Sequence, residues 1–406
     1  MADSEEVARP QVSNRDLNEV HDRLVSWLAG RLPDGADPQV SELSIPATNG
    51  MSSETLLFDA TWTEGGEARS ERCVVRMRPA LEAKPVFPTY DLDKQYRIMT
   101  LVGERCGIPV PKLLWNEPDE APLGAPFFVM GRAEGAAPPD VMPYTIDSWL
   151  LKADPADRRR LQEASVAIVA DIHGIAATPD EIEFLQLEQP GDSALRRHLN
   201  DLKAFYEWGI EGRRVPLLDR AFGWLDDNFP EDPGADVISW GDARIGNILY
   251  VDFAPTAVLD WEMAAVGPRE LDLAWMVFIH DFFQDIATRY GGLPGIPDLL
   301  RREDVYAQYE RLTGHTPVNT HYFEVYSAVR HGVVMARIAH RQAFFGERVM
   351  PEDLDETVLH RALIEKMLEG TYWDSLSVDT GTADTGTADA GTAGTTDTTG
   401  TAEAAK

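Results

Sequence analysis

The stretch that decides the fold is residues 239–262, which read SWGDARIGNILYVDFAPTAVLDWE. Residues 248–251 and 256–259 are rich in the branched and aromatic side chains that favour β-strands. Between them, residues 252–255 have the composition of a turn. The stretch therefore predicts a β-hairpin preceded by a polar loop.

The register of this hairpin brings oxygen-bearing side chains together. If Val251 pairs with Thr256, Asn247 lies opposite Asp260 at the open end, beside the loop that carries Asp242. Asn and Asp oxygens are hard ligands that suit Mg²⁺, which takes its remaining ligands from water and phosphates. Asp242 would then be free to orient a hydroxyl and accept its proton. This is the arrangement of kinases, in which a base Asp is followed by an Asn and a metal Asp.

The spelling of the motif resembles that of the aminoglycoside phosphotransferase-like kinases. Their hallmark is His-Gly-Asp, four residues, Asn, and a metal Asp after two short strands, and Trp240 stands here in place of the His. The continuation over residues 259–275 is similar to the branch related to kinase-like domains fused to acyl-CoA dehydrogenases, and to actinobacterial phosphotransferases. The resemblance covers roughly residues 43–373. It implies ATP as cofactor with Mg²⁺, Asp242 as catalytic base, and Asn247 and Asp260 as metal ligands.

The whole chain is expected to form an α+β, bilobed protein-kinase-like fold. Residues 1–130 would form an N-terminal helix plus a small β-rich, nucleotide-binding N-lobe, and residues 131–375 a larger, mainly helical C-lobe with the catalytic loop and the acceptor site. From Asp379 the chain repeats Thr, Gly, Ala and Asp without large apolar side chains, which predicts a disordered tail over residues 376–406.

On the phosphate side of the nucleotide, Gly50, Ser52 and Ser53 precede the first long strand, and their backbone N–H groups and hydroxyls could cover phosphates. An ordinary turn is the alternative. The resemblance places the phosphate-binding cation of the family at Arg76, with Arg78 as the fallback. An Arg can bind phosphate through two parallel hydrogen bonds.

Five further residues are expected near this site. The resemblance places Phe128 and Met130 in the strand that connects the lobes, whose backbone would bind adenine. It places Gln95 where the family has a helix Glu, so that it could hydrogen-bond to the cation without forming an ion pair. Glu262 follows the metal Asp and is either a further metal contact or part of a salt bridge. Arg244, inside the motif, is a possible supporting contact.

Composition excludes several classes of function. With 37 Lys and Arg against 68 Asp and Glu, the formal net charge is −31, so a general nucleic-acid binder is not expected. Such a surface hints at a cationic acceptor. Two cysteines offer no disulfide framework, and no run approaches the roughly 20 apolar residues of a membrane span. The acidic start of the chain lacks an apolar signal region, so a cytoplasmic protein without membrane partners is expected, and its oligomeric state stays open.

The function predicted is an ATP-dependent small-molecule O-phosphotransferase. It would transfer the γ-phosphoryl group to a hydroxyl of an aminoglycoside-like or other hydroxylated metabolite. A hydroxyacyl-CoA is the alternative acceptor: an antibiotic predicts a groove lined by carboxylates, whereas a CoA ester predicts Lys and Arg. The departures at Trp240 and Gln95 suggest an alternative of another class, an inactive nucleotide- or ligand-binding pseudokinase that acts as a regulator.

Overall fold

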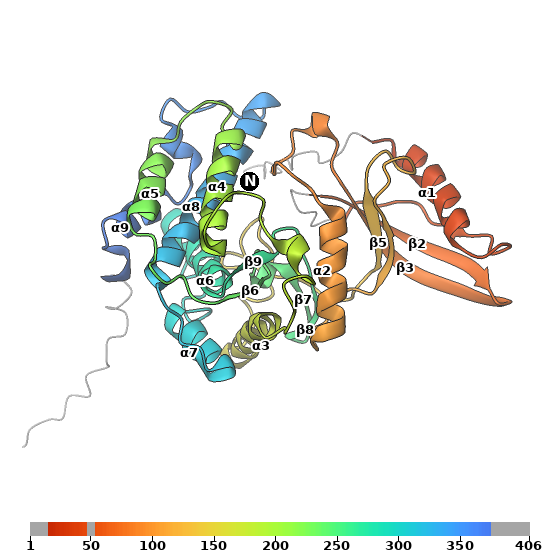
Figure 1. The fold of residues 1–406 in the computed structure, drawn as a ribbon, viewed down its shortest axis with the longest axis horizontal. Helices are drawn as coiled ribbons and strands as arrows, with labels where there is room; N and C mark the ends of the chain where they lie inside the picture. Colours follow the sequence, from red (N-terminus) through yellow and green to blue (C-terminus); the bar gives the residue numbers. More distant parts are fainter. Residues whose placement is uncertain (1–14, 47–52, 375–406) are drawn as a thin grey trace, which may run out of the picture.

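The computed structural model describes residues 15–46 and 53–374 of the chain. Figure 1 shows two lobes, a smaller one built on a β-sheet and a larger one built mainly of helices. The predicted α+β, bilobed fold is therefore confirmed. Gly50, Ser52 and the predicted tail lie outside the described residues.

The N-lobe is a five-stranded antiparallel sheet in the order β1-β2-β3-β5-β4. Its centre is the long β2–β3 hairpin, closed by Gly65 and Gly66, whose φ angles of 60° and 84° lie in the left-handed region that glycine adopts without strain. The end of this hairpin that is closed by the turn is largely exposed. The elements of this lobe are α1 (Leu17–Arg31), β1 (Gln39–Val40), β2 (Glu54–Glu64), β3 (Glu67–Met77), a 3₁₀ turn (Leu81–Ala83), α2 (Leu92–Arg105), β4 (Leu113–Glu117) and β5 (Phe127–Gly131).

Two helices cover opposite faces of this sheet (Figure 1). Helix α1 buries Leu24 and Trp27 in a core formed with β2, β3 and β5. Helix α2, N-capped by Asp91, buries Ile98 and Val102 in a second core that is continuous with the C-lobe. The α2 side of the sheet therefore faces the C-lobe, and α1 supports the sheet from behind.

The C-lobe packs its helices around α6 and α8, which are buried along most of their length. Two small two-stranded sheets, β6–β9 and β7–β8, carry the motif residues at the edge of this helical core. The elements are α3 (Pro155–His173), α4 (Ala194–Gly209), α5 (Pro216–Asp227), β6 (Asp236–Ser239), β7 (Ile248–Val251), β8 (Ala254–Val258), β9 (Ala265–Pro268), α6 (Glu270–Asp285), a π-helical turn (Ile286–Tyr290), α7 (Arg302–Thr313), α8 (Thr320–Phe344) and α9 (Arg361–Leu368), with short 3₁₀ turns at Glu183–Leu185, Ile245–Asn247 and Leu354–Thr357.

The predicted register of the motif hairpin is wrong. Val251 pairs with Ala254 instead of Thr256, because the turn consists only of Asp252 and Phe253, both with positive φ (50° and 64°). Two-residue turns with positive φ at both positions match the right-handed twist of the flanking strands, whereas type I and II turns would splay them. A bulge at Thr256 then shifts the strand, so that Leu259, and not Asp260, lies opposite Asn247.

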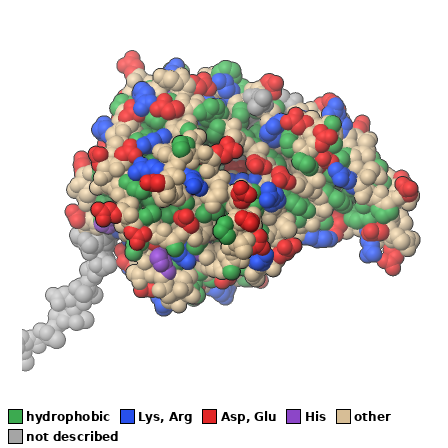
Figure 2. All heavy atoms as spheres, in the orientation of Figure 1, with side chains coloured by type: hydrophobic (Ala, Val, Ile, Leu, Met, Phe, Trp, Pro, Cys, Tyr) green, Lys and Arg blue, Asp and Glu red, His purple; other side chains and the backbone are tan. Residues whose placement is uncertain are grey.

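Two expectations from composition can be compared with the described residues. Cys73 and Cys106 are free thiols. Across residues 15–46 and 53–374, no helix combines the length and the apolar character that crossing a membrane requires. On the face drawn in Figure 2, Asp and Glu side chains are spread over both lobes and interleaved with Lys and Arg.

Candidate active site

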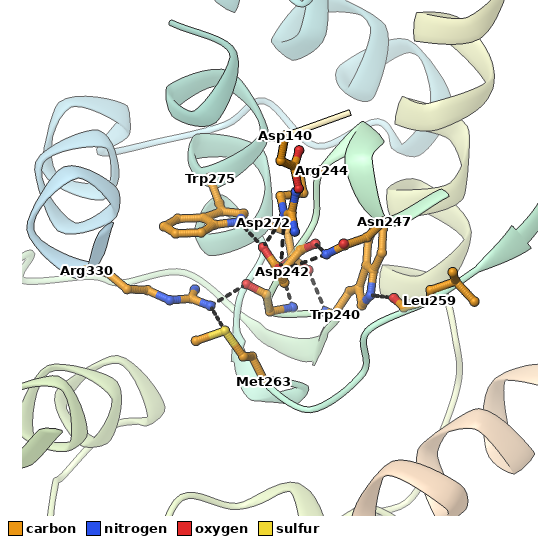
Figure 3. Close-up of polar contacts among 11 residues, drawn as sticks. Asp140, Trp240, Asp242, Arg244, Asn247, Leu259, Met263, Asp272, Trp275 and Arg330 are labelled. Atoms are coloured by element: carbon orange, nitrogen blue, oxygen red, sulfur yellow. Dashed lines mark hydrogen bonds and ion pairs between the residues drawn. The ribbon is translucent and has the colours of Figure 1, made fainter. Parts of the chain in front are cut away.

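Asp242 lies at the centre of a dense set of hydrogen-bond donors (Figure 3). Trp275 on α6 donates its indole N–H to Oδ1 at 2.6 Å, and the amide nitrogen of Asn247 donates to Oδ2 at 2.7 Å. The Nε of Arg244 lies 3.1 Å from both carboxylate oxygens. The three donors fix the orientation of the carboxylate before any substrate is present.

These partners also set the charge of Asp242. Burial by itself would raise its pKa, but Arg244 and Arg330 and the donors Trp275 and Asn247 outweigh this effect and hold the pKa below its usual range. Asp242 is therefore ionised at neutral pH. A carboxylate of lowered pKa is a weak proton acceptor and a good hydrogen-bond acceptor for a hydroxyl.

Arg244 connects Asp242 to the segment that links the lobes. Besides Asp242, its guanidinium forms an ion pair with Asp140, a residue that no sequence pattern singled out. Gly246 makes room for this pair, because a Cβ at that position would lie 2.6 Å from both Arg244 Nη1 and Asp140 Oδ1. The predicted supporting residue Arg244 thus contacts the base directly.

A second carboxylate, Asp272 at the start of α6, holds the loop that carries Asp242. It is fully buried and accepts hydrogen bonds from the Ser239 hydroxyl (2.9 Å) and from the backbone N–H groups of Trp240 (2.7 Å) and Gly241 (2.8 Å). The Nε2 of His173 lies 2.9 Å from Oδ2, the oxygen that also accepts from Trp240. Asp272 had no predicted role, and its signal in the sequence is a charge within a strongly apolar helix.

Trp240, which stands where the family has His, joins the loop that carries Asp242 to the segment just before Asp260. Its indole N–H donates to the backbone carbonyl of Leu259 at 3.0 Å, directly before Asp260. The side chain is fully buried and packs against Trp261, with ring centroids 5.9 Å apart. The aromatic replacement therefore supplies a donor as well as packing.

At the end of the hairpin, the Leu259 N–H donates to the Asn247 carbonyl at 2.9 Å, so that Asn247 lies opposite the residue that precedes Asp260. Asn247 uses its amide nitrogen on Asp242, which leaves its side-chain oxygen as the atom a cation would need. Among the described residues, no group of three or more His, Cys, Asp or Glu could hold a metal. Two hard oxygen donors fit Mg²⁺ that is also bound by phosphates and water, and do not fit a cation held by protein alone.

On the N-lobe side, Arg76 extends from β3 to this same point. Its Nη1 lies 2.7 Å from Asp260 Oδ1, and its Nη2 lies 3.9 Å from Glu262 Oε2. The structure therefore brings Arg76, Asp260 and Glu262 together from two lobes. Glu262 forms the salt bridge that was one of its two predicted roles.

The other predicted site residues of the N-lobe form fewer polar contacts than Arg76. Gln95 on α2 is 2% exposed, yet its amide nitrogen and the Nε of Arg76 have no hydrogen-bond partner within the described residues. Ser53 is also 2% exposed, and its hydroxyl has no hydrogen-bond partner within the described residues either. Phe128 and Met130 lie on β5, where their residues pair with β3 on one side and β4 on the other.

This geometry defines a class: a bilobed, protein-kinase-like phosphotransferase in which an Asp, an Asn and a second Asp lie along one loop and hairpin. A profile of the phosphotransferase enzyme family, APH, matches residues 58–305, more than half of the chain. The chain belongs to this family, and it is an enzyme of the phosphotransferase class. Asp140, Asp272 and Trp275, which sequence reasoning left without a role, all lie within the matched range.

Solved structures share the fold. A Ralstonia eutropha protein provisionally assigned as an aminoglycoside phosphotransferase matches 87% of this chain and 98% of its own, with a TM-score of 0.58 and 17% identity. An ethanolamine kinase of Plasmodium vivax matches 88% of this chain and 90% of its own, with a TM-score of 0.55 and 11% identity.

Curated relatives are larger proteins. The Arabidopsis thaliana protein named probable acyl-CoA dehydrogenase IBR3 is 25% identical over 263 residues, which are 63% of this chain and 30% of that protein. Human acyl-CoA dehydrogenase family member 11 is 25% identical over 238 residues, 56% of this chain and 28% of the relative. This chain thus spans less than a third of the length of these relatives.

Proposed function

We propose that this protein is an ATP-dependent small-molecule O-phosphotransferase that transfers the γ-phosphoryl group to a hydroxyl. The observation that carries the proposal is the set of donors around Asp242, together with Asn247 and Asp260 at the end of the same hairpin. This set orients an ionised carboxylate beside two oxygen ligands suited to Mg²⁺.

On the nucleotide side, Asn247 and Asp260 would hold Mg²⁺, which would supply positive charge against the phosphates. Arg76 would exchange part of its contact with Asp260 for the phosphates, using the Nε that has no partner among the described residues. The buried Ser53 hydroxyl would donate to a phosphate, with Gly50 and Ser52 before it. The backbone that leaves β5 at Phe128 and Met130 would bind adenine.

Asp242 would act mainly by orienting the acceptor. Its lowered pKa makes proton removal before phosphoryl transfer unfavourable, while its charge holds the hydroxyl in line with the phosphorus. Arg244 lies close enough to the carboxylate to offset charge that develops during transfer. Catalysis would then consist of positioning and charge neutralisation.

The acceptor would be an aminoglycoside-like or other hydroxylated metabolite. One observation favours the alternative, a hydroxyacyl-CoA: Asp140 and Asp242, the carboxylates beside the acceptor position, are both paired with Arg244. A polycation would have to compete with that guanidinium, whereas an anionic or neutral acceptor would not. The names of the curated relatives point to the same class of molecule.

The test is a screen for ATP consumption over aminoglycosides and hydroxyacyl-CoAs with wild-type protein and Asp242→Asn. We expect turnover on at least one acceptor, a loss of at least about a hundredfold in the variant, and affinity for AMP-PNP within about twofold of wild type. Asp252→Asn is the matched control, since Asp252 is an exposed turn residue whose positive φ an Asn tolerates. Its turnover should equal that of wild type.

Two outcomes would contradict the proposal. Undiminished turnover in Asp242→Asn would show that the assigned base is wrong. Binding of AMP-PNP without turnover on any acceptor would support the inactive regulator suggested by Trp240 and Gln95.

A further inference from the structure

The chain segment just before α1 is tied to the start of β2. The Nε of Arg15 lies 3.1 Å from Glu54 Oε2, and its Nη1 donates to the backbone carbonyl of Leu123 at 3.1 Å. Glu54 is the first residue of β2, and its side chain is 3% exposed. One guanidinium thus joins the N-terminal segment, the first long strand and the loop before β5.

Glu54 depends on this contact. A carboxylate that is buried needs an opposite charge or several donors, because leaving it unpaired in a low-dielectric environment costs several kcal/mol. Its other oxygen accepts a hydrogen bond of 3.4 Å from the backbone N–H of Ala80. Arg15 therefore supplies opposite charge to a carboxylate whose side chain is 3% exposed.

The position of Glu54 matters because its neighbours face the nucleotide side. Ser53, the preceding residue, carries the buried hydroxyl that has no partner among the described residues. Thr55, the following residue, pairs across the hairpin with Arg76. A displaced Glu54 would move a phosphate donor directly and the phosphate-binding cation through the strand pairing.

From these contacts we propose that Arg15 is a positioning residue for the nucleotide phosphates, acting through Glu54 on Ser53 and Arg76. The inference rests on the proposed function, since it assumes that a nucleotide binds there. It concerns a part of the chain that the matched family range, residues 58–305, does not include. Helix α1 would thus be a component of the nucleotide site rather than an appendage to it.

The test compares the affinities for AMP-PNP and adenosine, in Mg²⁺, of wild-type protein, Arg15→Gln and Glu54→Gln. We expect both variants to lose about five- to tenfold in affinity for AMP-PNP and less than twofold for adenosine, because only the phosphates are displaced. Arg15→Lys, which retains the charge, should bind AMP-PNP within about threefold of wild type. If Arg15→Gln does not fold, Glu54→Gln breaks the same pair from the other side.

Arg31→Gln is the matched control at the opposite end of α1. Arg31 pairs with Glu117, which also accepts a hydrogen bond of 2.9 Å from Trp27, so this variant weakens the attachment of α1 away from the nucleotide. It should leave the affinity for AMP-PNP unchanged.

Three results would overturn the inference. Equal losses for AMP-PNP and adenosine, or equal losses in Arg31→Gln, would show that α1 contributes only to general stability. Unchanged affinity for AMP-PNP in both pair-breaking variants would show that Arg15 has no part in phosphate binding. If wild-type protein bound neither ligand, the proposed function itself would be wrong, and the inference would fail with it.

Discussion

The two lobes differ in how completely the polar groups of the site are paired. In the C-lobe, Asp242 has three donors, and Asp272 has three donors and His173. In the N-lobe, Ser53, Arg76 and Gln95 each carry a buried polar atom without a partner among the described residues. The carboxylates of Asp242 and Asp272 thus have their hydrogen bonds in place, whereas each of these three N-lobe residues keeps a buried polar atom that has none in the described part of the chain.

The difference indicates a division of labour. Paired groups fix a geometry in advance, which is what orienting a hydroxyl requires. Unpaired buried groups lower stability until a ligand supplies the missing partners, and that free energy then favours binding. Changes in the C-lobe network should therefore act on stability and turnover, and changes in the N-lobe on nucleotide affinity.

The largest effect is expected from Asp272→Asn. An amide cannot accept from all the donors that now surround this carboxylate, so we expect a loss of about 3 kcal/mol in the free energy of unfolding, measured by urea denaturation at pH 7. Burial would raise the pKa of Asp272, but His173 and the backbone and hydroxyl donors lower it overall. Its stabilisation is therefore complete at neutral pH and is lost as the pH falls into the acid range.

Asp281→Asn, on the same helix, is the control. Burial raises the pKa of Asp281 to about 7, and its carboxylate accepts from the Tyr372 hydroxyl at 2.6 Å. The folded state holds a proton that the unfolded state releases, so wild-type stability falls as the pH rises through 7. The variant should be more stable than wild type at pH 8, with a smaller gain at pH 5. If it lost as much stability as Asp272→Asn, dense pairing would not be what distinguishes Asp272.

On the N-lobe side, Arg76→Lys should lower affinity for Mg²⁺·AMP-PNP about tenfold, with little change in the urea midpoint. Lys keeps the charge but lacks the two-pronged geometry of Arg. Isothermal titration calorimetry would measure the affinity. Arg78→Lys is the control. Arg78 lies two residues after Arg76, pairs with Glu120, and was the fallback for the phosphate-binding cation. A larger loss at Arg78 would move the phosphate contact there.

The smallest effect is expected from Trp240→Phe, which keeps the packing and removes the donor to Leu259. We expect the free energy of unfolding to fall by about 1 kcal/mol. We also expect Mg²⁺ to raise the affinity for AMP-PNP less than in wild type, measured with Mg²⁺ and with EDTA. Trp261→Phe removes a similar bond of 3.1 Å to Val258 from an equally buried ring. If both variants weakened Mg²⁺-dependent binding equally, the hydrogen bond from Trp240 to Leu259 would have no particular effect on Asp260.

Much of this arrangement could be predicted because it is local in sequence. Asp242, Asn247 and Asp260 lie within 19 consecutive residues, so a loop and a short hairpin are enough to bring them together. The error in the hairpin register is also local: Asp252 and Phe253 both adopt positive φ, which Asp tolerates and an aromatic residue rarely does. Nothing in the composition of residues 252–255 indicated the shorter turn.

What could not be predicted depends on residues far apart in the chain. Asp140 contacts Arg244 across 104 positions, and Arg76 meets Asp260 across 184. Gln95 is a residue whose position was predicted correctly but whose contact was not. The resemblance placed it on a helix, where the structure has it, but its expected hydrogen bond with Arg76 is absent among the described residues, because the cation pairs with Asp260 instead.

The sequence by itself thus determined the fold class and proposed Asp242, Asn247 and Asp260 as the base and the metal ligands, because they lie close together along one loop and hairpin. Only the tertiary structure decided which groups surround them. The charge of Asp242, the anchoring by Asp272 and the contact of Arg15 with Glu54 each depend on packing between elements that no local pattern connects. Which distant charges pair depends on which side chains are buried together, and that is decided only when the whole chain has folded.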